Sequence, residues 1–128
     1  MARILVIDDE ELILRTLKGA LEAAGYDVVT ARDGKQGLAR LREQEFDLIV
    51  TDIIMPQMEG IETIREIRRT APDIPIIAAS GGGQLGRERL LGMSVALGAT
   101  ASIAKPFRPR DLIALIERHL PEGAGRQA

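Results

Sequence analysis

The sequence predicts an α/β fold: one doubly wound domain in which helices cover both faces of a five-stranded parallel sheet. Short apolar runs alternate with longer segments whose apolar residues recur at helical spacing. Strands that are apolar throughout are typical of parallel sheets, because both of their faces are covered. The 128 residues, 45% of them hydrophobic, suffice for one substantial core. These observations favour five successive β-α units.

The first half of the chain is predicted to hold three strands and two helices. The first strand is an apolar run that stops at Asp8, and Gly25 marks the end of the first helix, because glycine tolerates the left-handed backbone found there. Consecutive β-branched residues indicate the second strand. In order, the expected elements are a strand over 3–7, a helix over 10–24 with Ile13, Leu17, Ala20, Leu21 and Ala24 facing the core, a strand over 27–31, a helix over 34–44 and a strand that ends at Asp52.

The second half continues the alternation. Pro72 breaks the third helix, because proline lacks the N–H that a helix interior needs. Pro109 suits the first turn of the last helix, and Pro121 marks its end. In order, the expected elements are a helix that packs Ile61, Ile64 and Ile67, a strand over 76–79 ending at Ser80, a loop opened by Gly81, Gly82 and Gly83, a helix over 87–97 that buries Leu90, Leu91 and Val95, a strand over 101–104 and a helix that packs Leu112, Ile113, Leu115 and Ile116.

Composition excludes several classes of protein. A net charge of −2 and the scarcity of aromatic residues disfavour direct binding to nucleic acid or to an anionic membrane. The absence of cysteine excludes disulfides and thiolate metal sites. No run approaches the roughly 18 apolar residues of a membrane span, and no signal peptide is recognised, so we expect a cytoplasmic protein. Residues 1–121 are expected to form the domain, and 122–128 a disordered tail.

Charged residues stand where predicted strands end. Asp8 and Asp9 follow the first strand, Asp52 follows the third and Lys105 follows the fifth. Because the carboxyl ends of parallel strands meet at one edge of an open sheet, we expect three acids and one ammonium in a single pocket. Such acids repel one another unless a divalent cation neutralises them. The pattern therefore predicts a hard metal and an anionic ligand.

Each of these residues also has an ordinary structural explanation. Acids at 8–11 would complement a helix N-terminus, and Asp52 or Ser80 could each cap a helix. An isolated lysine is usually a solvated surface residue. Unrelated caps need not all fall at strand ends, however, so the joint placement favours a functional site.

One motif does not fit the chemistry that it usually indicates. Gly81, Gly83 and Gly86 spell the dinucleotide fingerprint G-x-G-x-x-G. The acid expected about twenty residues later is missing, and the next strand ends in Lys105 instead. We therefore expect no nucleotide or flavin cofactor.

The ordered set of motifs resembles the receiver domain of two-component response regulators, a chemotaxis-regulator-like domain with a flavodoxin-like (βα)5 fold. The resemblance covers about residues 2–120 and implies the strand order 2-1-3-4-5. The motifs that carry it are Asp8-Asp9, the run D-I-I-M-P-Q-M-E-G that starts at Asp52, Ser80 and Lys105-Pro106-Phe107.

The resemblance implies a role for each residue of the site. Asp52 would be the phosphoacceptor, Lys105 would pair with the phosphoryl oxygens, and the hydroxyl of Ser80 would turn toward them after transfer. Mg²⁺ would be the cofactor, bound directly by Asp9 and through water by Asp8. The metal ligands implied are Asp8, Asp9, Asp52 and the backbone carbonyl of Ile54. The Lys105–Pro106 bond would be the family's cis peptide bond.

The function implied is a phosphorylation-controlled signalling switch. The chain would take a phosphoryl group from a histidine kinase or a histidine phosphotransfer protein and then change its binding face for a downstream protein target. It would catalyse only its own phosphorylation and dephosphorylation, and a phosphorylation-dependent dimer is compatible with this interpretation.

Two alternatives remain open. A Mg²⁺-dependent phosphohydrolase of haloacid-dehalogenase type shares aspartyl-phosphate chemistry, but it would need a second acid where Ile54 follows Asp52 and Ile53. A degenerate receiver that serves only as a docking module is the other. Turnover of a small phosphate ester tests the first, and a phosphorylation assay tests the second.

Two departures from the family pattern concern the switch. Ser102 stands three residues before Lys105, where the family usually has tyrosine or phenylalanine. The stretch from Ser80 to Lys105 is also longer than usual and contains three consecutive glycines. We therefore expect the response to phosphorylation to concentrate in residues 81–86 and the helix that follows, linked to the phosphoryl group through Ser80.

Overall fold

The computed structural model describes residues 1–53, 59–80, 92 and 98–121, with the backbone alone at 59, 60 and 80. Four predictions therefore lie outside the described residues: the carbonyl ligand at Ile54, the glycine loop over 81–86, the helix over 87–97 apart from Gly92, and the tail over 122–128.

Five parallel strands form one sheet in the order β2-β1-β3-β4-β5, which confirms the predicted fold class and strand order. The central strand β3 is buried at all of its positions, as expected for an apolar run between two layers. The strands are β1 (Arg3–Ile7), β2 (Asp27–Ala31), β3 (Leu48–Asp52), β4 (Ile76–Ser80) and β5 (Ala101–Ala104).

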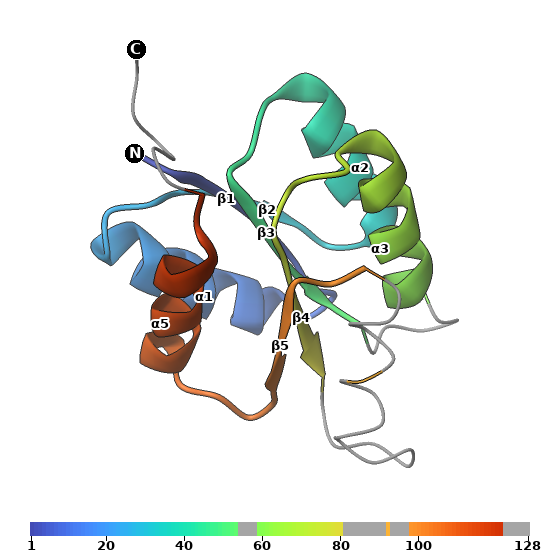
Figure 1. Cartoon of the computed structure of the whole chain (residues 1–128). Helices are drawn as coiled ribbons and strands as arrows, with labels where there is room; N and C mark the ends of the chain where they lie inside the picture. Colours follow the sequence, from blue (N-terminus) through green and yellow to red (C-terminus); the bar gives the residue numbers. More distant parts are fainter. Residues whose placement is uncertain (54–58, 81–91, 93–97, 122–128) are drawn as a thin grey trace.

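Helices cover both faces of the sheet (Figure 1). The described helices are α1 (Glu11–Ala23), α2 (Gly34–Glu43), α3 (Glu59–Thr70) and α5 (Pro109–His119). Helices α1 and α5 lie on one face and α2 and α3 on the other, so the sheet separates two cores. Residues of one strand alternate between the cores, because successive side chains of a strand point to opposite faces. In β1, for example, Ile4 and Val6 belong to the α1/α5 core, and Leu5 and Ile7 to the α2/α3 core.

Helix α1 ends at the glycine that the sequence indicated. Gly25 adopts a left-handed backbone with a φ of 99°. Its N–H donates to the carbonyl of Glu22 at 3.0 Å, and the N–H of Tyr26 donates to the carbonyl of Leu21 at 3.1 Å. These two bonds are the Schellman arrangement, which satisfies carbonyls that the helix itself leaves without donors.

The buried face of α1 differs from the predicted face. Ala24 is exposed, so the expectation that it faces the core was wrong: the chain turns away from the helix at this C-cap position. Leu14, which was not expected in the core, is only 5% exposed and packs beside Leu17 and Leu21. Ile13 is partly buried at the edge of the same cluster.

Helices α3 and α5 bury part of the set that their periodicity predicts, and Ile61, Ile113 and Leu115 of that set are only partly buried. Ile64 and Ile67 of α3 are fully buried, as are Leu112 and Ile116 of α5. None of the helices in the described part of the chain has the length and apolarity needed to cross a bilayer.

The register of the strands places the predicted site residues at one edge of the sheet. Ile7 pairs with Thr51, Asp52 with Ala79, and Ser80 with Ala104. The residues that end β1, β3, β4 and β5 therefore lie at similar heights, and the side chains that follow them can meet.

Candidate functional site

Lys105 joins two buried carboxylates that are far apart in the sequence. Its ammonium Nζ lies 2.9 Å from Oδ2 of Asp8 and 3.0 Å from Oδ2 of Asp52. The side chains of both aspartates are 5% exposed and that of Lys105 is 19% exposed. The three residues come from the ends of β1, β3 and β5, so the gathering expected from the strand ends is present.

The electrostatic environment of Lys105 favours its charged form. Burial by itself lowers the pKa of a lysine, since it removes the ammonium from water. The hydrogen bonds and negative charges of Asp8 and Asp52 outweigh this effect and raise the pKa of Lys105 above its ordinary value of 10.5. Lys105 is therefore a permanent cation at neutral pH, placed beside the carboxylate oxygens.

Asp8 is held from both sides. Its backbone N–H donates to the carbonyl of Ala31 at the end of β2, at 3.1 Å. Its Oδ1 accepts the backbone N–H of Glu10 at 2.9 Å, and its Oδ2 accepts from Lys105. Both oxygens of this carboxylate thus have protein partners.

An acidic group at the start of α1 has the ligand chemistry of a hard cation. Oxygen atoms of Asp8, Asp9 and Glu10 lie within 4.8 Å of one another. Asp8 is buried, whereas Asp9 and Glu10 are exposed. A set of carboxylate oxygens with two members open to solvent fits Mg²⁺, which prefers oxygen ligands and keeps several waters.

Glu10 was not among the metal ligands expected from the sequence. It belongs to the same run of acids, but the family pattern drew attention to the aspartate pair alone. Asp52 is not one of these three clustered acids. Lys105 connects it to them, because the same ammonium pairs with both Asp52 and Asp8.

The remaining predicted residues have backbone positions or lie outside the described part. Ser80 ends β4 opposite Ala104, and nothing further is described of it. Ser102 lies half-buried on β5 and borders a hollow of about 430 Å³ beside α5. The peptide bond between Lys105 and Pro106 is cis, as the resemblance implied.

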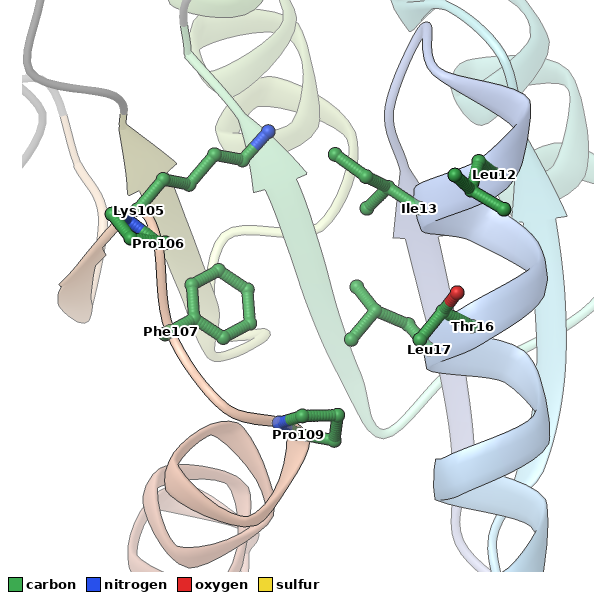
Figure 2. A pocket seen from close by; sticks show the side chains of 8 residues that line it. All are labelled: Leu12, Ile13, Thr16, Leu17, Lys105, Pro106, Phe107 and Pro109. Carbon is green, nitrogen blue, oxygen red and sulfur yellow. The ribbon is translucent and has the colours of Figure 1, made fainter.

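An apolar groove of about 440 Å³ adjoins Lys105. Figure 2 shows the side chains of α1 on one side of this groove and those of the β5–α5 connection on the other. Leu12 of α1 borders it and is 74% exposed. The lining residues are Leu12, Ile13, Thr16, Leu17, Lys105, Pro106, Phe107 and Pro109.

Residues 4–117 match a family model described as the response regulator receiver domain. The alkaline phosphatase synthesis transcriptional regulatory protein PhoP of Bacillus subtilis is 37% identical over 115 residues, which cover 90% of this chain and 47% of that protein. The transcriptional regulatory protein CpxR of Escherichia coli K12 is 37% identical over 116 residues, covering 91% of this chain and 48% of that protein. The chain thus spans about half the length of these curated relatives.

Solved structures of response regulator proteins also superpose on this chain. A CheY-like response regulator receiver domain protein from Methanospirillum hungatei superposes with a TM-score of 0.85 and 37% identity, covering 95% of each chain. The chemotaxis response regulator CheY4 of Vibrio cholerae superposes with a TM-score of 0.82 and 32% identity, covering 92% of this chain and 98% of its own.

Proposed function

The chain belongs to the response regulator receiver family, and from this premise we propose that Asp52 is its phosphoacceptor and that phosphorylation of Asp52 controls a signalling switch. The observation that carries the proposal is the contact of one ammonium, Lys105, with both Asp8 and Asp52 at the carboxyl edge of the sheet. A buried aspartate at this edge, beside a fixed cation, is suited to attack an incoming phosphoryl group.

The reaction is the transfer of a phosphoryl group from a phosphohistidine to a carboxylate. An oxygen of Asp52 forms a bond to phosphorus while the P–N bond to the imidazole breaks, and the imidazole leaves with that electron pair. Attack by a carboxylate on a phosphoryl dianion is opposed by charge repulsion. Lys105 reduces this repulsion, because its ammonium lies 3.0 Å from Oδ2 of Asp52 and can pair with the phosphoryl oxygens.

Mg²⁺, when bound, supplies the further positive charge that the transferring group needs. Asp9 is the proposed direct ligand, because it is exposed, whereas both oxygens of Asp8 already have protein partners. Asp8 would then act through water. Asp52 and the carbonyl of Ile54 complete the proposed set.

We propose a histidine kinase or a histidine phosphotransfer protein as the phosphodonor. Its histidine must reach Asp52, so the donor has to meet the edge of the sheet where Lys105 lies. The apolar groove that adjoins Lys105, with Leu12 exposed beside it, provides contact area on that side.

The proposed output is a change of binding face that a downstream protein senses. The receiver is proposed to occupy residues 1–121 and to make no direct contact with nucleic acid, in keeping with its net charge of −2. Relatives twice as long are named transcriptional regulators, so an attached output domain is one form that the downstream protein can take. The receiver is not expected to turn over an external substrate.

The first experiment tests the phosphoacceptor. Incubation with acetyl phosphate and Mg²⁺ should add one phosphoryl group by intact mass, and hydroxylamine should remove it. Asp52→Asn should abolish the addition, because an amide is a poor nucleophile, whereas the control Asp73→Asn should phosphorylate normally. Persistence of the label in Asp52→Asn contradicts the proposal. Absence of any label from the parent favours a docking module, and steady release of phosphate from p-nitrophenyl phosphate favours a phosphohydrolase.

A second experiment tests the metal site without phosphorylation. Mg²⁺ should raise the melting temperature of the parent by mass action, because it binds the folded chain and relieves repulsion among carboxylates. Asp9→Ala should lose most of this increase. Glu11→Ala, which removes an exposed acid of the first turn of α1, should keep it. An equal response to Mg²⁺ in Asp9→Ala and the parent would show that Asp9 is not a ligand.

A further inference from the structure

One arginine of α3 is hydrogen-bonded to the residues just before β5, the strand that Lys105 directly follows. Arg68, in the last turn of α3, donates through Nε to the carbonyl of Gly98 at 2.8 Å and through Nη2 to Oγ1 of Thr100 at 3.2 Å. Its Nη1 donates to carbonyls in the connection from α3 to β4, including that of Pro72 at 3.2 Å and that of Ile74. One guanidinium therefore ties three segments of the chain together.

The backbone of Gly98 lies close to the side chain of Arg68. Gly98 has a φ of 118°, which side chains other than glycine rarely adopt. A Cβ at this position would also lie 3.0 Å from Cγ of Arg68. The aliphatic stem of Arg68 thus packs against the backbone whose carbonyl its Nε holds.

Thr100 connects Arg68 to the sheet, because it is hydrogen-bonded both to Arg68 and to β4. Its backbone N–H donates to the carbonyl of Ile76 at 2.7 Å, and its Oγ1 accepts the N–H of Ile76 at 3.0 Å. Ile76 is the first residue of β4 and Thr100 directly precedes β5. The pair therefore determines where β5 starts to pair with β4, and the next pair is Ile77 with Ala101.

Strand β5 needs such a determinant. It is a four-residue strand at the edge of the sheet, and all of its residues are only partly buried, in contrast to β3. The buried face of a strand specifies its register, and the residues of β5 that pack on the α1/α5 core, Ala101 and Ile103, are only partly buried. A slip of one residue would move the chain by about 3.3 Å and turn each side chain to the other face of the sheet. Lys105 would then lose its contacts with Asp8 and Asp52.

We propose that Arg68 is a positioning residue for Lys105: by holding Gly98 and Thr100, it sets the register of β5 against β4 and so places the ammonium between the two carboxylates. This inference rests on the proposed function where it concerns phosphoryl transfer, but the placement of Lys105 can be measured without transfer.

The chain offers matched variants for the test. Arg69 is the next residue of α3, is 77% exposed and pairs only with Glu66 among the described residues. Arg68→Ala and Arg69→Ala therefore remove the same charge from the same helix end, but only the first removes the bonds to Gly98 and Thr100. Thr100→Val removes the hydroxyl while keeping the shape, and Thr100→Ser keeps the hydroxyl.

The first measurement is the rate of Asp52 phosphorylation by acetyl phosphate at saturating Mg²⁺, at a temperature where every variant is folded. Arg68→Ala and Thr100→Val should slow the reaction by about ten- to a hundredfold, since small misplacements of a reacting constellation have effects of this size. Arg69→Ala and Thr100→Ser should stay within about twofold of the parent. Equal rates for Arg68→Ala and Arg69→Ala would overturn the proposal.

A double-mutant cycle separates positioning from general damage to the fold. If Arg68 acts through Lys105, Arg68→Ala should add almost nothing to the loss caused by Lys105→Ala. An undiminished loss in the Lys105→Ala background would overturn the proposal, because a merely structural role does not depend on the lysine.

The last measurement needs no phosphorylation. In the metal-free parent, the NMR signal of the Lys105 ε-methylene should be that of an immobilised side chain, and amide exchange at Ser102 and Ala104, whose N–H groups face β4 as that of Thr100 does, should be slow. Arg68→Ala should shift that signal toward the free-lysine position and accelerate exchange, with Arg69→Ala unchanged. An unaltered signal in Arg68→Ala refutes the positioning role even if Asp52 is phosphorylated. A failure to phosphorylate the parent refutes the proposed function and leaves this readout valid.

Discussion

Among single residues, Lys105 supplies the positive charge that balances the two buried carboxylates, Asp8 and Asp52. Without its ammonium, two carboxylates that are each 5% exposed would face one another with no cation from the described chain between them. Removing one partner of a buried ion pair is costly, because it leaves an uncompensated charge in a poorly solvated place. Lys105 thus stabilises the fold through its contacts with Asp8 and Asp52.

This argument predicts the behaviour of Lys105→Met, which keeps the length of the side chain and removes its charge. In EDTA at pH 7, the free energy of unfolding should fall by about 1–3 kcal/mol relative to the parent. Urea denaturation measures it, with the exposed Lys35→Met as the control. An unchanged free energy of unfolding in Lys105→Met would mean that the two contacts add nothing to stability.

Lys105→Met also tests how the free energy of unfolding depends on pH. Because the pKa of Lys105 is raised in the folded chain, its contribution is fully present below pH 10.5 and is lost as pH rises through the higher folded value. The parent should therefore lose stability faster than Lys105→Met above pH 10.5. Tyr26, whose pKa is raised by burial and then by Glu117, contributes to the alkaline loss in both proteins and cancels in the comparison.

At the scale of elements, α2 approaches its neighbours through glycines. A Cβ on Gly34 would lie 1.8 Å from Oγ1 of Thr63 in α3, and one on Gly37 would lie 2.4 Å from Cδ1 of Ile7 in β1. Thr63 is 3% exposed and its χ1 is stiff, so it has little room to move away. By contrast, Gly19 in α1 has no atom within 4 Å of the place its Cβ would take.

Two alanine substitutions should therefore have opposite signs. Gly19→Ala should stabilise the protein by about 0.5–1 kcal/mol, because alanine loses less backbone entropy than glycine in a helix. Gly34→Ala should destabilise it by about 1–3 kcal/mol, because the added methyl group forces α2 and α3 apart. The midpoints of urea denaturation check both values. A stabilised Gly34→Ala would show that the contact between α2 and α3 is loose.

At the scale of the whole molecule, the sheet carries the site at one edge and connects it to both cores. Ser80 at the end of β4 pairs with Ala104, immediately before Lys105. The chain between Ser80 and Gly98 thus starts at the site edge and ends at the residue that Arg68 holds.

The sequence predicts that the response to phosphorylation concentrates in the three consecutive glycines after Ser80 and the residues that follow, which lie outside the described part of the chain. Phosphorylation should slow amide exchange over residues 81–86, because consecutive glycines have many backbone states and the new charge can draw Ser80 inward. Ser80→Ala should still be phosphorylated but should lose most of this protection. Hydrogen exchange followed by mass spectrometry measures it, and equal protection in Ser80→Ala would exclude the hydroxyl as the link.

Local sequence patterns sufficed to predict the described strands and helices and the sheet edge where the charged residues gather. Apolar runs, β-branched residues and helix stops are local signals, so the strands, the cap at Gly25 and the breaks at Pro72 and Pro109 could be located from neighbours in the chain. The acids and the lysine could be assigned to one edge, because all parallel strands end on the same side. The strand order and the roles of the residues came from the family resemblance, and the structure confirms the order.

How the residues of the site meet depends on packing between segments that are distant in the sequence. The sequence does not distinguish the buried Asp8 from the exposed Asp9, because burial depends on the strands and helices packed around each residue. It places Glu10 next to Asp9 but does not show that their oxygens converge. Arg68 and Arg69 are neighbouring residues of the same type in the sequence. The proposed role of Arg68 rests on hydrogen bonds to residues that lie about thirty positions away in the chain. Contacts at such separations depend on strand register and helix packing, which local sequence patterns do not specify.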